Sequence, residues 1–226
     1  MSDEELQKSD ADTTRERILE AAEEVFAAKG FNQATVREIL KRAGVSNIAA
    51  INYHFGDKER LYIETVKNAH SCCNAVQFPN WPAGTPAEQK LRDFIHVLAE
   101  RMLQPLRQSA IQVVMREMAD PTQARDEVVR EYIQPMADLL RTILSEMLPT
   151  MPQERIMLIG NSIVGQCLFY RQNRPIIERL MGEEALNRVT PDVLADHVAG
   201  FTLAALAANG TERTSGTNGA QSNSSN

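Results

Sequence analysis

The chain has 226 residues and 43% hydrophobic residues, enough for one large domain or a small domain with a larger one. Its formal net charge of −6 excludes a protein that coats nucleic acid without sequence preference, although it permits a local basic patch. Aromatic residues make up only 5%, and a composition rich in Ala, Leu and Met favours helices over strands.

The N-terminal segment, residues 1–12, is polar and acidic, which predicts a disordered N-terminus. No apolar run follows Met1, and no stretch reaches the roughly 18 apolar residues of a membrane span. We therefore expect a cytoplasmic protein without a membrane partner. Thr13 and Glu16 form a capping box before a helix over 14–29, which Gly30 ends.

Two short helices joined by a tight turn are predicted between Thr35 and Phe55. Thr35 caps the first helix, which ends at the pair Ala43-Gly44 because glycine adopts the left-handed conformation at no steric cost. Ser46 is the predicted cap of the second helix. Its predicted apolar side holds residues at i, i+3 and i+7, namely Ile48, Ile51 and Phe55.

The opposite side of the second helix carries no carboxylate, which is unusual for a surface helix. Its residues are Asn47, Ala49, Ala50, Asn52, Tyr53 and His54. Alanines allow close approach to thymine methyls, the two amides can pair with adenine edges, and the two rings can donate to phosphates. A helix-turn-helix in the DNA major groove is therefore one interpretation. An ordinary helical hairpin with a polar outer face is the alternative.

The sequences RAGV at 42–45, INYHF at 51–55 and GDK at 56–58 decide between these alternatives. Together with the preceding helix, they resemble the DNA-binding domain of the TetR family of transcriptional regulators over about residues 14–68. The resemblance implies a contact set of Thr35, Arg37, Asn47, Ala49, Ala50, Asn52, Tyr53, His54 and Lys58. One departure is visible: the chain is one residue longer than the usual family pattern between Gly44 and Phe55.

The rest of the chain divides at a break rich in proline and glycine over 75–87. We predict an all-α protein: a helix-turn-helix domain with its connecting helix over 13–74, and a helical effector-binding and dimerisation domain over 75–208. Pro135 should kink a long helix over 124–148. Residues 209–226 are rich in Ser, Asn and Gly and are predicted to form a disordered tail.

The segments 131–148 and 162–180 resemble the C-terminal domain of the CecR-type subgroup of the same family. That resemblance implies a repressor of transport or drug-sensitivity genes, released from its operator by a small-molecule effector. The candidate effector-pocket residues have polar ends or soft side chains: Gln112, Met115, Arg116, Met118, Met147, Gln166, Tyr170 and Asn173. The alternative is that the methionines fill the core and the polar residues face water.

A near-palindromic double-stranded operator requires two recognition helices about 34 Å apart, and so predicts a homodimer. Small residues on helices 153–171 and 191–208 can form its interface: Gly160, Gly165, Ala199, Gly200, Ala204 and Ala205. The alternative is that they pack within one chain.

No catalytic constellation, metal-ligand spacing or phosphate loop is present in the sequence, so we expect no enzyme, metal or cofactor. A DNA-binding activator or architectural regulator without an effector, and a protein-binding helical adaptor, are the remaining alternatives.

Overall fold

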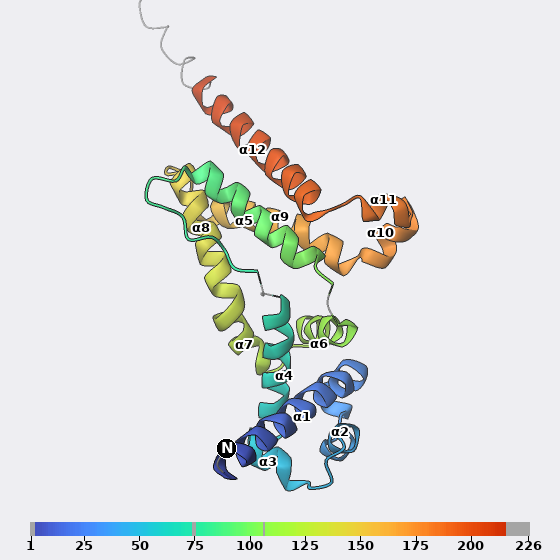
Figure 1. Cartoon of the computed structure of the whole chain (residues 1–226). Coiled ribbons are helices and arrows are strands. Elements are labelled where there is room, and N and C mark those ends of the chain that lie inside the picture. The colour runs from blue at the N-terminus through green and yellow to red at the C-terminus, as the bar shows by residue number, and fades with distance from the viewer. Residues whose placement is uncertain (1–2, 74–75, 106, 216–226) are drawn as a thin grey trace, which may run out of the picture. The chain divides into compact units, whose positions relative to one another are not determined.

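The computed structural model describes residues 3–73, 76–105 and 107–215, and every regular element in these ranges is helical (Figure 1). The all-α class predicted from the sequence is therefore confirmed. Within the same ranges, no helix has the length and hydropathy needed to cross a bilayer.

The elements follow one another with short connections. They are α1 (Asp3–Gln33), α2 (Val36–Ala43), α3 (Ala49–Phe55), α4 (Lys58–Cys73), α5 (Ala87–Leu103), α6 (Gln108–Ala119), α7 (Ala124–Val128), the π-helix η1 (Val129–Ile133), α8 (Gln134–Met147), α9 (Gln153–Gln172), α10 (Arg174–Met181), α11 (Glu183–Asn187) and α12 (Pro191–Ser215).

Contacts divide the chain into two compact units. The N-terminal unit comprises Met1–Ala75 and Gln104–Ala137, and the C-terminal unit comprises Val76–Leu103 and Asp138–Asn226. This division differs from the predicted boundary near residue 75, because α6 packs against α1 and α4, and α7 packs against α4. Each unit therefore combines two separate stretches of the sequence.

The ends of the chain differ from the sequence expectation. Helix α1 already begins at Asp3, where residues 1–12 were predicted to be disordered. Gly30 interrupts α1 with φ 74°, as predicted for the end of the helix over 14–29. Helix α12 continues to Ser215, beyond its predicted end at 208. The rest of the predicted tail, 216–226, lies outside the described residues.

The core of the N-terminal unit holds fully buried aliphatic or aromatic side chains from each of its first four helices: Ile18 and Phe26 from α1, Ile39 from α2, Ile51 from α3 and Leu61 from α4. A pair of short amphipathic helices cannot bury its own apolar stripes, so α1 and α4 supply the missing surface. Burying these large side chains stabilises the orientation of α2 and α3.

Pro135 produces the predicted break in the helix over 124–148, although as a π-turn rather than a simple kink. Proline has no backbone N–H, so the Glu131 carbonyl lacks its usual i+4 donor. The backbone widens there: the Gln134 N–H donates to the carbonyl of Val129, five residues earlier.

The C-terminal unit is built around α5, which packs against α9 and α12 (Figure 1). The segment before α5 is fastened to it by aromatic and polar contacts. Phe78 stacks on Phe94 with ring centroids 4.7 Å apart, and the Trp81 indole N–H donates to Asp93 at 2.8 Å. The Arg101 guanidinium lies 4.3 Å from the Phe78 ring and donates to the Val76 carbonyl at 2.8 Å.

Candidate nucleic-acid interface

The first helix of the predicted helix-turn-helix has the predicted caps. The Thr35 hydroxyl accepts the Glu38 N–H at 3.2 Å, and Gly44 ends α2 with φ 66°. Arg17 of α1 reaches this end and donates to the carbonyls of Ala43 at 2.5 Å and Gly44 at 3.3 Å. Helix α1 thus satisfies two carbonyls that the end of α2 leaves without a helical partner.

The second helix begins later than predicted. Helix α3 starts at Ala49, and Ser46 is not its cap. The Asn47 side-chain oxygen accepts the Ala49 N–H at 2.9 Å, and its carbonyl accepts the Ala50 N–H at 3.1 Å. Asn47 was predicted to read adenine, and its oxygen is now committed to closing this turn.

Two positions correct the predicted faces of α3. Ala50, predicted to face DNA, is only 8% exposed and belongs to the hydrophobic core. Ile48, predicted to be apolar and inward, is 60% exposed. Because the helix starts at Ala49, its buried side is centred on Ile51 and Phe55, and Ile48 lies beyond the edge of the core.

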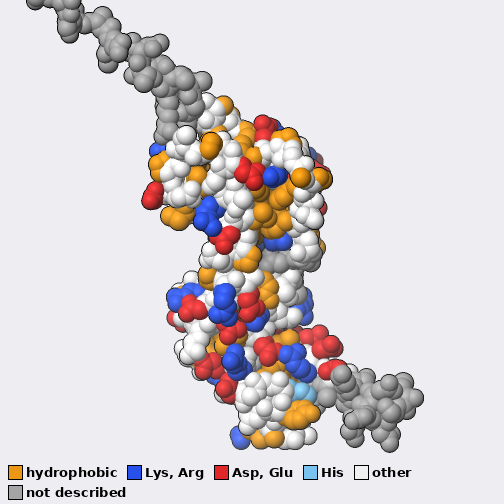
Figure 2. Space-filling view, turned by 90° about the vertical axis from the view of Figure 1, so that its left-hand side faces the viewer, with side chains coloured by type: hydrophobic (Ala, Val, Ile, Leu, Met, Phe, Trp, Pro, Cys, Tyr) orange, Lys and Arg blue, Asp and Glu red, His pale blue; other side chains and the backbone are white. Residues whose placement is uncertain are grey.

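The exposed face of α3 follows helical spacing. Ile48 lies one turn before Asn52, and Ala49 lies one turn before Tyr53. Tyr53 is 79% exposed and makes an edge-to-face contact with the half-buried His54, with ring centroids 4.8 Å apart. None of these residues carries a negative charge. Figure 2 shows this end of the N-terminal unit with uncharged and basic side chains at its tip and acidic side chains farther along.

Helix α2 adds positive charge beside this face. Arg37 and Lys41 are exposed, and neither forms an ion pair with any described residue. The other cations nearby are engaged: Lys29 pairs with Glu38 at 2.7 Å, and Arg42 pairs with Glu24. Arg37 and Lys41 therefore remain available for an external anion.

Lys58, the predicted phosphate ligand, opens α4. Its ammonium lies 4.5 Å from the centroid of the Phe31 ring, and partial burial lowers the pKa of Lys58. The adjacent Asp57 caps α4, since its carboxylate accepts the Arg60 N–H at 2.7 Å. The ring of Phe31 thus holds the lysine near the start of this helix.

The eight candidate effector residues do not come together within either unit. Those on α6 belong to the N-terminal unit, and the other four belong to the C-terminal unit. Arg116 donates to the carbonyls of Ala27 at 2.8 Å and Ala28 at 3.0 Å. Met115 and Met118 are 37% and 48% exposed, which contradicts the alternative that they fill the core.

In the C-terminal unit, two of the candidate polar residues already have partners within α9. The Gln166 amide donates to the Ser162 carbonyl and the Asn173 amide donates to the Phe169 carbonyl, both at 3.2 Å. Met147 and Tyr170 are half-buried. Among the described side chains, no group of three His, Cys, Asp or Glu is arranged to hold a metal ion.

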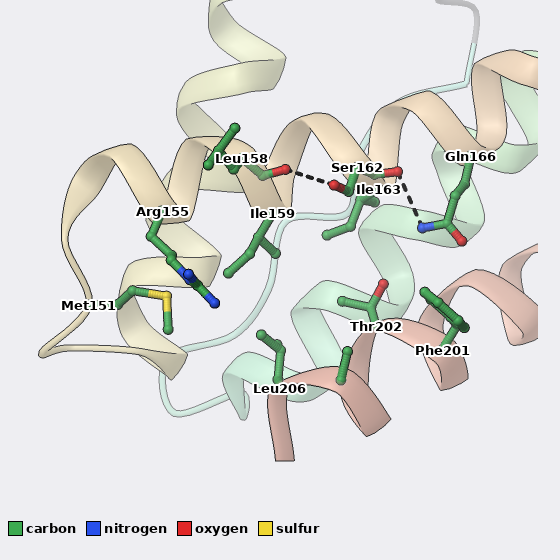
Figure 3. A pocket seen from close by; sticks show the side chains of 11 residues that line it. Met151, Arg155, Leu158, Ile159, Ser162, Ile163, Gln166, Phe201, Thr202 and Leu206 are labelled. Carbon is green, nitrogen blue, oxygen red and sulfur yellow. Dashed lines mark hydrogen bonds between the residues drawn. The ribbon is translucent and has the colours of Figure 1, made fainter. Parts of the chain in front are cut away.

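An open groove of about 280 Å³ runs between α9 and α12 in the C-terminal unit (Figure 3). Leu158, Ile159 and Ile163 line it from α9, and Phe201 and Leu206 line it from α12. Figure 3 shows Ile159 and Ile163 on the side of α9 that faces Leu206 and Phe201 of α12. Leu158 and Phe201 are 62% and 63% exposed, so the groove is an apolar surface without a cover in the single chain.

The small residues predicted for an interface fall into two groups. Gly160 and Ala199 are buried within the chain, and an added Cβ at Gly160 would meet Leu140 at 3.4 Å. Gly165 and Gly200 are exposed, and added Cβ atoms there would meet no atom of the described residues within 4 Å. Ala204 and Ala205 are also exposed.

A rigid three-helix platform that presents a short, carboxylate-free helix beside free cations defines a helix-turn-helix regulator. The family comparisons agree. Residues 18–65 match the model of bacterial regulatory proteins of the tetR family, and residues 87–208, more than half of the chain, match the C-terminal domain of the HTH-type transcriptional dual regulator CecR. The chain belongs to the TetR family of DNA-binding transcriptional regulators and has a CecR-type C-terminal domain.

Some curated relatives align with most of this chain, and others align with only a part of it. CecR of Shigella flexneri is 27% identical, over 72% of this chain and 78% of CecR. AcrR of the same species is 29% identical, over 63% of this chain and 70% of AcrR. The match to the repressor NicS of Pseudomonas putida is 34% identical but spans only 40% of NicS, and the match to BepR of Brucella suis spans 29% of BepR.

Solved structures share the fold. A TetR-like regulator from Rhodococcus sp. RHA1 aligns with a TM-score of 0.56 and 18% identity, over 86% of this chain and 96% of that one. The hemolysin II regulator HlyIIR aligns with a TM-score of 0.53 and 23% identity, over 80% of this chain and 98% of HlyIIR.

Proposed function

We propose that the protein is a cytoplasmic, homodimeric repressor that occupies a near-palindromic operator and is released by a small-molecule effector. The observation that carries this proposal is the face formed by Ala49, Asn52 and Tyr53, which is exposed, uncharged and held rigid by α1 and α4. Relatives named repressors support the direction of control. The resemblance to the CecR-type subgroup points to transport or drug-sensitivity genes, which are therefore the proposed targets.

The roles of the contact residues follow from their exposure. Asn52 is placed to pair with an adenine edge, and Ala49 to touch a thymine methyl. Arg37 and Lys41, which have no internal ion pair among the described residues, are placed to neutralise phosphates. Thr35, Tyr53, His54 and Lys58 remain proposed contacts to the backbone.

The exposed groove between α9 and α12 supports dimerisation through these two helices. Exposed apolar patches with small residues are typical of surfaces that a partner covers. Gly165 and Gly200 leave room for another helix to approach, whereas Gly160 and Ala199 are used inside the chain. We therefore place the twofold interface on the outer face of α9 and α12.

Helix α6 supplies the route by which an effector changes DNA affinity. It is tied to α1 by Arg116, and by Arg107 and Ser109, which donate to the Glu23 carboxylate at 2.9 and 2.6 Å. It is tied to α4 by the Tyr62 hydroxyl, which donates to Glu117 at 2.9 Å. An effector that binds more tightly to one position of α6 then shifts the helix-turn-helix toward the matching position. The size of that shift is set by the difference between the effector's affinities for the two positions.

Selection of bound fragments from random DNA is the direct test of operator binding. We expect a near-palindromic site. Arg37→Ala should weaken binding and reduce the salt slope by about two for the dimer, because each subunit then neutralises one phosphate fewer. Arg130→Ala is the matched control, since Arg130 is 69% exposed on η1 of the same unit. Equal, weak binding to all duplexes would contradict the proposed function.

Effector release requires a separate test. A panel of hydrophobic compounds is added to the protein on its selected operator, and release of DNA by any of them supports the sensor. Since CecR of Shigella flexneri is named a dual regulator, a reporter gene downstream of the selected site decides between repression and activation.

A further inference from the structure

Ile48 is the most exposed large aliphatic residue among the described residues of the N-terminal unit, at 60%. It occupies the last position before α3, with helical backbone angles of φ −64° and ψ −25°. Its neighbours Ser46 and Asn47 are exposed and polar, and Ala49 is exposed and small. An isolated isoleucine thus stands at the leading end of the recognition helix.

The turn explains why this side chain points outward. The Val45 N–H donates to the Leu40 carbonyl at 2.9 Å, and the Val45 side chain packs against the core. The Asn47 side chain then closes the next turn onto Ala49. Ser46, Asn47 and Ile48 are therefore the three exposed positions between Val45 and α3 that follow Gly44.

The position of Ile48 determines what it can meet on DNA. The N-terminal residues of a recognition helix approach base edges in the major groove. Isoleucine has no hydrogen-bonding group, and the only apolar group that bases present in that groove is the 5-methyl of thymine. A polar base edge against Ile48 would lose its water without gaining a partner.

We infer that Ile48 is a specificity-determining residue that contacts the 5-methyl group of a thymine in each half-site. The inference rests on the proposed operator binding and adds a defined base preference to it. Ile48 and Asn52 lie one helical turn apart on the same face. A thymine read by Ile48 should therefore lie within a few base pairs of the adenine proposed for Asn52.

The test uses the operator obtained by selection and replaces thymine by uracil, which removes only the methyl group. One substitution at a time is made symmetrically in both half-sites, and affinity is measured for the full-length protein. From the free energy of burying one methyl group we expect about a fourfold loss per half-site, hence about fifteenfold for both, at one thymine position. Replacing that T·A pair by C·G should weaken binding, and 5-methylcytosine should restore part of it.

Ile48→Ala should bind the thymine and uracil operators equally, whereas Ser46→Ala should keep the wild-type difference. Suppose that wild type binds its operator specifically, but every uracil substitution changes the affinity of wild type and of Ile48→Ala by the same factor. The inference about Ile48 is then overturned, and operator binding stands. A uniform loss in Ile48→Ala that leaves the uracil effect intact also overturns it. If wild type selects no site at all, operator binding itself fails and the inference falls with it. The uracil substitutions show with wild-type protein whether a thymine methyl group is read, and the comparison of Ile48→Ala with Ser46→Ala assigns that methyl group to Ile48 rather than to Ala49.

Discussion

The two units expose opposite kinds of helical surface. In the N-terminal unit, α3 exposes Asn52 and Tyr53 beside the cations of α2. In the C-terminal unit, α9 and α12 expose Leu158 and Phe201 around two unobstructed glycines. Both pairs of helices bury their other sides in a core. The exposed residues therefore indicate which partner each surface suits. A polar, cationic face suits DNA, and an apolar face with small residues suits a second copy of the chain.

The largest effect is expected from blocking the apolar face. Gly165→Arg places a long charged side chain where an added Cβ has free space, so the single chain should still fold. Two chains could no longer approach there, and operator affinity should fall on the order of 10³-fold because bivalent binding is lost. Sedimentation velocity and gel shift measure the two effects.

Thr142→Arg is the matched control, because Thr142 is exposed on α8 of the same unit. It should leave both the assembly state and the affinity unchanged. Gly160→Ala should leave the assembly state unchanged, since its Cβ would lie inside the chain in van der Waals contact with Leu140 at 3.4 Å. A Gly165→Arg protein that stays dimeric would remove α9 from the interface.

The sequence predicted the helix-turn-helix well because its signals are local. Thr35 and Gly44 mark the ends of α2 through cap chemistry that depends on adjacent backbone alone. The start of α3 was missed because Ser46 is a good cap residue, whereas in the structure the Asn47 side chain closes the turn by accepting the Ala49 N–H. The helix therefore starts two residues later than predicted, and the assigned exposure of Ile48 and Ala50 is reversed.

Which distant helices pack together was harder to predict from the sequence. Helix α6 was assigned to the effector domain by its place in the chain, yet Arg107 at its N-cap and Arg116 and Glu117 within it bind partners in α1 and α4. Those partners lie 55 or more residues away in the sequence. Periodicity shows that a helix has a polar face and does not show which helix that face meets.

A second expected effect concerns stability of the N-terminal unit in acid. His70 stacks on Tyr132 of η1 with ring centroids 5.9 Å apart, and its Nε2 is buried without a hydrogen-bond partner among the described residues. Burial lowers the pKa of His70 from 6.5 to about 4. The unfolded chain therefore binds the proton first as pH falls, and stability decreases between pH 6.5 and pH 4, by up to about 3 kcal/mol.

His70→Phe retains a ring against Tyr132 and removes the titrating group. The difference in free energy of unfolding between pH 7 and pH 4.5 should be smaller in this variant than in wild type, as measured by urea denaturation. Ser71→Ala should keep the wild-type dependence, because Ser71 is exposed on the same helix α4 and does not titrate. An identical pH dependence in wild type and His70→Phe would refute the role of His70.

The smallest expected effect tests how tightly α6 is fastened to the DNA-facing unit. The buried Glu117 carboxylate, 2% exposed, accepts bonds from the Tyr62 hydroxyl at 2.9 Å and the Thr122 N–H at 2.8 Å. Burial and this hydrogen bond raise the pKa of Tyr62. Tyr62→Phe removes one donor and should cost about 1 kcal/mol, because the ring still packs against Phe26 and Glu117 keeps Thr122.

Glu117→Ala should cost more, about 2 kcal/mol, because it leaves the buried Tyr62 hydroxyl and the Thr122 N–H without an acceptor. In the double variant, Tyr62→Phe should recover part of the cost of Glu117→Ala, because it removes the hydroxyl that is left without an acceptor. Urea denaturation of the four proteins measures this coupling. Additive costs would show that α6 is held to α4 by packing alone, and the hydrogen bond would then have no part in how α6 positions the helix-turn-helix.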